Sequence, residues 1–190
     1  MGMSLPWSSA SLSGTILFMW RTLARRPGDV LRARMEWGIR DECSVLVHAP
    51  VGTVWEMISD VTRTGGWSPE NRGALRITGR TEPLPGSWFL GLNRIGPVPW
   101  VTPCEVTVVD APRQFEFRVY GIGTWWGYRL RAVDGGTLVT EYRDWPDSSL
   151  LAKMLRWSGP IGKPRDNLAL ANMSRSLHRL REVAEAGRRA

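Results

Sequence analysis

Hydrophobic positions follow two different periods along the chain, and the change between them predicts the order of the elements. From Glu42 to His48, valine and leucine alternate loosely with other residues, which indicates a strand. Pro50 suits the first turn of a helix, where a missing N–H is tolerated. The apolar residues that then recur at helical spacing should face the sheet, and they are Val51, Val54, Trp55 and Ile58.

From residue 74 onward the period falls to two, and turn residues separate short runs. This pattern predicts a continuous antiparallel meander. Its strongest hairpin signal is Asp134-Gly135-Gly136. The predicted strands are 75–82, 87–94, 100–109, 114–120, 124–133 and 137–144.

Helical spacing returns near the C-terminus. Residues 150–157 predict a short apolar helix that ends before Gly159-Pro160. After Pro164, apolar residues at spacings of three and four predict an amphipathic helix of about twenty residues with its apolar face on the sheet. The stripe consists of Leu170, Met173, Leu177, Leu180 and Ala184.

Composition adds a large aromatic content to this picture. A length of 190 residues with 43% hydrophobic content fits one domain with extensions. The chain holds eleven tryptophans, each with a large flat surface and one N–H that needs a partner. Such residues either pack a core or line a pocket.

The net charge of +7 is confined to the two ends of the chain. Residues 41–149 carry a net −3, whereas residues 1–40 carry +4 and residues 150–190 carry +6. A basic groove inside the fold is therefore not expected, and neither is nucleic-acid binding by the folded part. The basic ends either stay solvated or make weak contact with an anionic membrane.

Residues 1–40 read as an N-terminal extension with three open interpretations. The segment is a disordered or loosely helical tail, an interfacial amphipathic anchor, or the upstream extension of a start at Met35. The apolar run from Thr15 to Trp20 is too short to span a bilayer. Its arginines follow the apolar run, whereas a secretory signal has its charges first.

Histidine and cysteine are too scarce for a metal site or a disulfide framework. The chain holds Cys43, Cys104, His48 and His178, with no metal-ligand spacing among them. His48 should lie at a sheet edge and His178 on the basic side of the last helix. No metal or cofactor is expected, and a reducing cytoplasm is the expected compartment.

Several segments together resemble the SRPBCC superfamily, also called START-like or polyketide cyclase/dehydrase and lipid-transport proteins, and most of all its small actinobacterial members. The resemblance covers about residues 41–186. It is specific for fold and weak for function, because this fold hosts binders, transporters, cyclases and sensors. The matching residues are Ala49-Pro50 to Val54-Trp55, Ser59-Asp60, Trp67-Ser68-Pro69-Glu70, Gly86, Phe89 to Arg94, Trp100, Trp126 to Leu130 and Gly135 to Glu141.

The resemblance implies an α+β helix-grip fold in residues 41–190. A curved antiparallel sheet of about seven strands would wrap around the long C-terminal helix, with two short helices after the first strand. A ligand would lie between sheet and helix. The ligand-binding residues expected there are Trp55, Trp67, Phe89, Asn93, Trp100, Phe117, Trp126, Glu141, Met173 and Leu177.

The alternation of side chains along a strand indicates which polar residue could take part in catalysis or ligand binding. Thr137, Val139 and Glu141 share one strand face, so an apolar side ends in a carboxylate. That carboxylate either has a raised pKa in an apolar site or pairs with Arg129 or Arg94.

Other polar candidates have two readings each. Asn93 and Arg94 either reach a cavity mouth or satisfy backbone and solvent. Gly91 leaves space where a ligand or a helix comes close. Glu70 either begins a helix or faces the ligand, and Tyr128 and Tyr142 either offer hydroxyls to a ligand or are structural.

Three functions remain. The first is binding of a lipid, polyketide or aromatic molecule in an internal cavity. The second is a polyketide cyclase or aromatase that uses Arg94, Glu141 and a tyrosine such as Tyr128. The third is a lipid carrier that docks on membranes through its basic ends. The ligand, any reaction and the oligomeric state stay open.

Overall fold

The computed structural model describes residues 37–78, 82–121, 123–146 and 162–187. The interpretations of residues 1–36 and the short helix predicted over 150–157 lie outside these ranges. The chain divides into the units Met1–Glu36 and Trp37–Ala190, and the fold described is that of the second.

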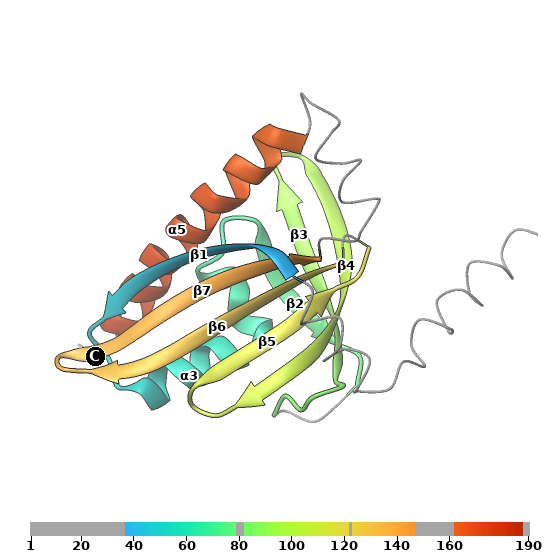
Figure 1. Ribbon diagram of the computed structural model, residues 1–190. Helices are drawn as coiled ribbons and strands as arrows, with labels where there is room; N and C mark the ends of the chain where they lie inside the picture. Colours follow the sequence, from blue (N-terminus) through green and yellow to red (C-terminus); the bar gives the residue numbers. More distant parts are fainter. Residues whose placement is uncertain (1–36, 79–81, 122, 147–161, 188–190) are drawn as a thin grey trace, which may run out of the picture. The chain divides into compact units, whose positions relative to one another are not determined.

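A seven-stranded antiparallel sheet forms the framework, in the order β1-β7-β6-β5-β4-β3-β2 (Figure 1). Consecutive strands from β2 to β7 pair with each other, which confirms the predicted meander, and β1 pairs with β7. The strands are β1 (Trp37–Val47), β2 (Asn71–Arg76), β3 (Trp88–Ile95), β4 (Val98–Asp110), β5 (Gln114–Val119), β6 (Thr124–Val133) and β7 (Gly136–Pro146).

Cross-strand register divides the sheet into two faces. Val139 of β7 lies opposite Val45 of β1 and opposite Leu130 of β6, and Phe115 of β5 continues this apolar face. This side, called the inner face below, packs against the helices. The other side is called the outer face. Because side chains alternate along a strand, the register assigns each strand residue to one face.

Strand β2 lies earlier in the sequence than predicted. It runs from Asn71 to Arg76, whereas the alternation suggested 75–82. The Ser68 hydroxyl accepts the backbone N–H of Asn71 at 3.0 Å and so prepares the strand start. At its end, Ile77 and Thr78 both donate to the carbonyl of Trp88, and the regular ladder stops.

The helix after β1 confirms its prediction. Helix α3 (Val51–Ser59) follows Pro50 and buries Val54 and Ile58, together with Met57, which the spacing argument did not include. Trp55 is half-buried, and its ring meets Phe115 edge to face with centroids 6.4 Å apart. The helix therefore covers the inner face at β5.

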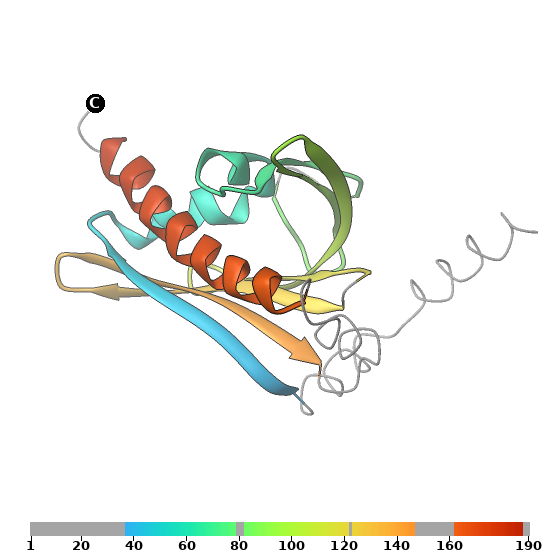
Figure 2. The same cartoon turned by 90° about the horizontal axis from the view of Figure 1, so that it is seen from above.

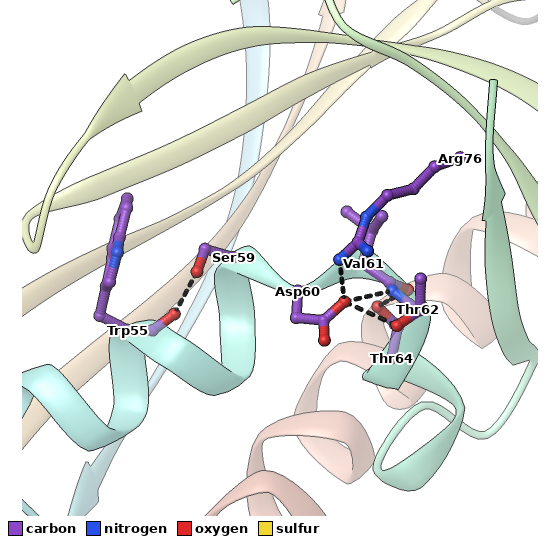
Figure 3. A network of polar contacts seen from close by, with 7 residues as sticks. All are labelled: Trp55, Ser59, Asp60, Val61, Thr62, Thr64 and Arg76. Atoms are coloured by element: carbon purple, nitrogen blue, oxygen red, sulfur yellow. Dashed lines mark hydrogen bonds and ion pairs between the residues drawn. The ribbon is translucent and has the colours of Figure 1, made fainter. Parts of the chain in front are cut away.

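A polar network joins α3 to the sheet edge (Figure 3). Asp60 caps the short 3₁₀ helix η1 (Val61–Gly66) by accepting from the backbone N–H and the hydroxyl of Thr62, at 3.1 and 2.6 Å. The same carboxylate oxygen accepts from Arg76 of β2 at 2.6 Å. Because Asp60 and Arg76 are partly exposed, this ion pair positions the turn more than it stabilises the fold.

The long helix α5 (Gly162–Ala186) lies on the same side of the sheet as α3 (Figure 2). Its predicted apolar stripe is confirmed where side chains are described, since Met173, Leu177, Leu180 and Ala184 are buried. His178 is exposed, as expected. The helix begins at Gly162, slightly before the predicted start after Pro164.

Helix α5 is also tied to the end of β1. Glu185 accepts the backbone N–H of His48 at 3.0 Å, and the exposed His48 ring contacts the carbonyl of Gly135 at 3.1 Å. His48 therefore lies where β1 ends at the sheet edge, as predicted. Within the part of the chain that the structure describes, no helix is long and apolar enough to cross a membrane.

Candidate functional site

The inner face and the helices that cover it hold all the residues expected to bind a ligand. The register places the sheet members of this set on the inner face. The helices supply the remainder. The sheet members are Phe89, Asn93, Trp100, Phe117, Trp126 and Glu141, and the others are Trp55 of α3, Trp67 after η1, and Met173 and Leu177 of α5.

Aromatic rings form a continuous surface across this face. Phe117 contacts Phe89 at a centroid distance of 5.3 Å and Phe115 at 6.2 Å. In the register, Phe117 lies opposite Trp126 of β6. Both Phe117 and Trp126 are only partly buried although they point to the inner side, so the described core does not cover them completely.

A carboxyl and a phenol lie directly opposite each other in this apolar surface. Glu141 of β7 pairs with Tyr128 of β6 in the ladder, and the Tyr128 hydroxyl donates to Oε1 of Glu141 at 3.0 Å. Both side chains are buried. The other oxygen of Glu141, Oε2, has no hydrogen-bond partner among the described residues. This oxygen is therefore a buried polar atom whose hydrogen-bonding capacity is unused among the described residues.

Burial controls the ionisation of this pair. Removal from water raises the pKa of Glu141 to about 8, and the hydrogen bond from Tyr128 offsets part of that rise. Burial, first, and then the neighbouring Glu141 raise the pKa of Tyr128 well above its usual value. At neutral pH Glu141 therefore holds its proton, and the expectation of a raised pKa in an apolar site is confirmed.

Replacing Tyr128 with phenylalanine should raise the pKa of Glu141 further. The phenol hydroxyl is the donor that favours the carboxylate form, and its loss leaves burial unopposed. A pH titration of the Glu141 side-chain carbon by NMR should show its midpoint moving upward. A midpoint unchanged or lowered in Tyr128→Phe would contradict the assigned hydrogen bond.

Neither arginine proposed as a partner of Glu141 contacts it. Arg129 of β6 points to the outer face and pairs with Glu42 at 2.6 Å. Arg94 is exposed near the end of β3, and its Nε donates to the carbonyl of Gly96 at 2.7 Å. The ion-pair alternative is therefore wrong, because the register turns both side chains away from the inner face.

The arginine on the face of Glu141 is one that the sequence reasoning missed. Arg143 lies two residues further along β7, and parity alone places it on the inner face. It is 5% exposed, its guanidinium binds Asp41 of β1, and it lies 5.6 Å from the centre of the Trp126 ring. A buried, paired cation therefore borders the same surface.

Side-chain amides fill the inner face at the β2–β3 end. Asn93 donates to Thr102 Oγ1 at 3.0 Å and to the Gly91 carbonyl at 3.1 Å, and it accepts from Asn71 at 3.1 Å. A Cβ added at Gly91 would meet the Asn71 amide at 3.4 Å. The space at Gly91 is thus bordered by the amides of Asn71 and Asn93.

Glu70 does not begin a helix, so one of its two readings is wrong, and Tyr142 takes the structural one of its two readings. Glu70 is not at a helix start, since it lies in the bend before β2, where its carboxylate accepts from Asn172 of α5. Tyr142 faces outward and donates to Glu116 at 2.7 Å. Of the two tyrosines, only Tyr128 lies on the inner face.

Further unpartnered polar atoms lie in the buried core. Within the described ranges, Trp67 Nε1 and Thr124 Oγ1 have no hydrogen-bond partner, and the register places Thr124 on the inner face. Burial raises the pKa of the Cys104 thiol to about 12, which makes it a poor nucleophile. The described residues contain no cluster of three or more His, Cys, Asp or Glu suited to a metal ion.

Comparison with known proteins gives one family and a set of similar folds. The family model described as polyketide cyclase / dehydrase and lipid transport matches residues 39–185. No curated protein matches the chain.

Solved structures with the same fold have low sequence identity to this chain. The polyketide cyclase-like protein Cgl2372 of Corynebacterium glutamicum is 24% identical, with a TM-score of 0.58 over 78% of this chain and 92% of that one. Protein Ms6760 of Mycobacterium smegmatis is 19% identical, with a TM-score of 0.57 over 78% and 92%. The di-domain ARO/CYC StfQ of the steffimycin biosynthetic pathway is 12% identical, with a TM-score of 0.62 over 84% and 54%.

Proposed function

Because this chain belongs to the polyketide cyclase / dehydrase and lipid-transport family, we propose that it binds a hydrophobic small molecule between the inner face and α5. Glu141 and Tyr128 would hold the polar group of that molecule. A lipid, a polyketide or an aromatic compound fits this description.

The observation that carries the proposal is the free oxygen of Glu141. A buried polar atom without a partner is costly, and native proteins keep few of them. A ligand that hydrogen-bonds Oε2 would remove this cost. The incompletely covered rings of Phe117 and Trp126 would supply the apolar contact for the rest of the molecule.

The protonation of Glu141 narrows the chemistry of the ligand. Tyr128 already donates to Oε1, so the proton of the neutral acid is directed from Oε2. The ligand atom opposite it would be a hydrogen-bond acceptor such as a carbonyl or ether oxygen. A carboxylate ligand is disfavoured, because the buried cation on this face, Arg143, is already engaged by Asp41.

A second candidate function is acid–base catalysis of the cyclase or aromatase type. The pKa of Glu141, raised by burial to about 8, lies close to the range in which a carboxyl both gives and takes protons at neutral pH. Tyr128 would orient it. Arg94 does not belong to this arrangement, since it lies outside the inner face, and Arg143 is the arginine nearest in position along β7.

Three variants of Glu141 and one control distinguish the two functions. Native mass spectrometry of the purified chain should show a co-purified apolar molecule, and its extract then serves as the probe. A binder should retain affinity in Glu141→Gln, because the amide both accepts from Tyr128 and donates, and should lose it in Glu141→Leu and Glu141→Ala. The exposed Glu56→Gln should bind as the original chain does.

Turnover and pH dependence complete the test. Binding to the original chain should weaken as the pH rises through 8 and Glu141 loses its donor proton, whereas Glu141→Gln should bind equally at all these values. If the original chain converts the bound molecule to a product and Glu141→Gln still binds that molecule but forms no product, the result would favour acid–base catalysis over binding alone. Unchanged affinity in Glu141→Leu would overturn the role given to this carboxyl.

A further inference from the structure

Exposed apolar residues gather at one end of the β3–β4 hairpin. Ile95 and Val98 are 43% and 61% exposed, and they face each other as the last pair of the ladder. Between them lies a two-residue turn of Gly96 and Pro97, in which Gly96 takes the left-handed φ of 56°. The hairpin thus presents apolar side chains from a tight and well-defined turn.

Both faces of this end of the hairpin are apolar. Ile95 and Val98 continue the inner face beyond Asn93, whereas Leu92 and its partner Val101 point outward. Val101 is 55% exposed. The outer face of an antiparallel sheet is ordinarily polar where it meets water, so this pattern is unusual.

The outward apolar surface extends to the edge strand. Leu90 continues it along β3, and its ladder partner on β2 is Leu75, which is 57% exposed. The apolar area therefore covers the tip and one side of the hairpin.

The charged residues near the tip are two exposed arginines, Arg94 and Arg72, and Glu70, whose carboxylate is engaged by Asn172 of α5. In residues 83–104 the only charged residue is Arg94, which is exposed and donates to the turn carbonyl of Gly96. Arg72, at the neighbouring end of β2, is also exposed. The segment 83–104 holds no carboxylate to repel an anionic surface.

The tip lies at a defined place in the fold. The backbone N–H of Arg94 donates to the carbonyl of Glu70 at 2.9 Å, and the Glu70 carboxylate accepts from Asn172 of α5. Figure 1 shows the β3–β4 turn and the first residues of α5 at the same end of the fold.

We propose that this tip, residues 95–101, inserts between the headgroups of an anionic lipid membrane, with Arg94 and Arg72 beside the lipid phosphates. A protein partner would cover one face of the hairpin, whereas lipid surrounds a hairpin tip that is apolar on both faces. The arginines give the electrostatic attraction and the aliphatic side chains the apolar contact. Trp100, partly buried at the base of the tip, suits the interfacial region.

This contact differs from one made by the basic ends of the chain, and it does not depend on a ligand at Glu141. The charge of the ends attracts any anionic surface and is screened by salt. Insertion of the tip adds an apolar term that persists at high salt. Substitution of an uncharged tip residue therefore distinguishes the two mechanisms, because it should weaken membrane binding only if the tip inserts.

The test is vesicle co-sedimentation of the full chain with phosphatidylcholine alone and with added phosphatidylglycerol. Val98→Asp should reduce binding to the anionic vesicles about tenfold or more, because it removes an aliphatic group that would insert into the membrane and adds a charge that the anionic lipids repel. Ile95→Asp should repeat this loss. The matched control is Val183→Asp on α5, where the same residue type is 41% exposed, and it should bind as the original chain does.

Each other outcome overturns the proposal. Equal binding by Val98→Asp would assign membrane contact to the basic ends alone. No binding of the original chain to either vesicle would exclude the contact. Dimerisation of the original chain in light scattering that Val98→Asp abolishes would make the tip a protein interface. Circular dichroism and urea midpoints confirm that the variants remain folded.

Discussion

Glu141→Gln should stabilise the folded chain at neutral pH and remove much of its pH dependence between pH 5 and 8. Burial raises the pKa of Glu141 from 4.5 in the unfolded chain to about 8 in the folded one. Below 4.5 both states hold the proton, and Glu141 carries no ionisation penalty. As the pH rises from 4.5 to 8, the unfolded chain releases the proton that the folded chain retains, so stability is lost.

The size of the effect follows from the pKa difference. At about 1.4 kcal/mol for each unit of pH, the loss at pH 7 is on the order of 3 kcal/mol. Above pH 8 both states are ionised and the penalty stays constant. Glutamine keeps the volume and the acceptor for Tyr128 but has no proton to release, so the part of the fall in stability that Glu141 causes should be absent from the variant.

Urea unfolding from pH 5 to pH 9 measures the prediction directly. The control is Glu56→Gln, which alters an exposed carboxyl on α3 and should follow the pH curve of the original chain. Parallel curves for Glu141→Gln and the original chain would show that Glu141 is ionised in the folded state. The proposal that Glu141 donates a proton from Oε2 to a ligand would then be wrong.

The hydrophobic pattern of the sequence predicted those strands whose ends are set by residues next to them in the chain. The strand over 124–133 was predicted with the bounds that the structure gives, because glycine-containing segments, Gly121 to Gly123 and Asp134 to Gly136, flank it on each side. Strand β2 was misplaced because its ends depend on the Ser68 hydroxyl and on the ladder with β3, which are not local properties of 71–76. Period-two alternation alone does not specify where pairing begins.

The candidate site was partly contained in the sequence. The pair of Val133 with Gly136 closes the Asp134-Gly135 turn, and counting back along both strands places Tyr128 opposite Glu141. The hairpin signal therefore could have given the partner of the carboxyl. The distance between Glu141 and Arg94 could not be predicted in this way, because β3 and β7 are separated in the sheet by three strands.

The buried carboxylate of the outer face was not predicted. Glu116 alternates with phenylalanines along β5, a pattern typical of a solvated acid, yet it is 1% exposed. Thr107 and Tyr142 both donate to it, at 2.8 and 2.7 Å. Space for the Tyr142 ring comes from Gly127, which lies opposite both Tyr142 and Glu116 in the ladder. The sequence shows a glycine there but not the ring that covers it.

Because the Tyr142 ring lies on Gly127, Gly127→Ala should cause a large loss of folding stability. A Cβ at Gly127 would lie 2.4 Å from the Tyr142 ring carbon Cζ and from its hydroxyl. The ring is 1% exposed, and its hydroxyl also accepts from Gln114 at 2.8 Å, so it has no free direction in which to move. The alanine variant should lose about 2–3 kcal/mol of unfolding free energy through overpacking and a weakened bond to Glu116.

Two controls separate the clash with the Tyr142 ring from the general effect of replacing a glycine on backbone freedom. They are a glycine without close neighbours, Gly52, and a double-mutant cycle with Tyr142. Gly52→Ala in α3 adds a Cβ with nothing within 4 Å, and it should stabilise the chain by up to about 1 kcal/mol. Tyr142→Leu should cost stability alone, but much less in the Gly127→Ala background, because the clash is removed with the ring. Additive costs in the cycle would mean that the Tyr142 ring does not lie on Gly127, and the buried Glu116 would then need another explanation.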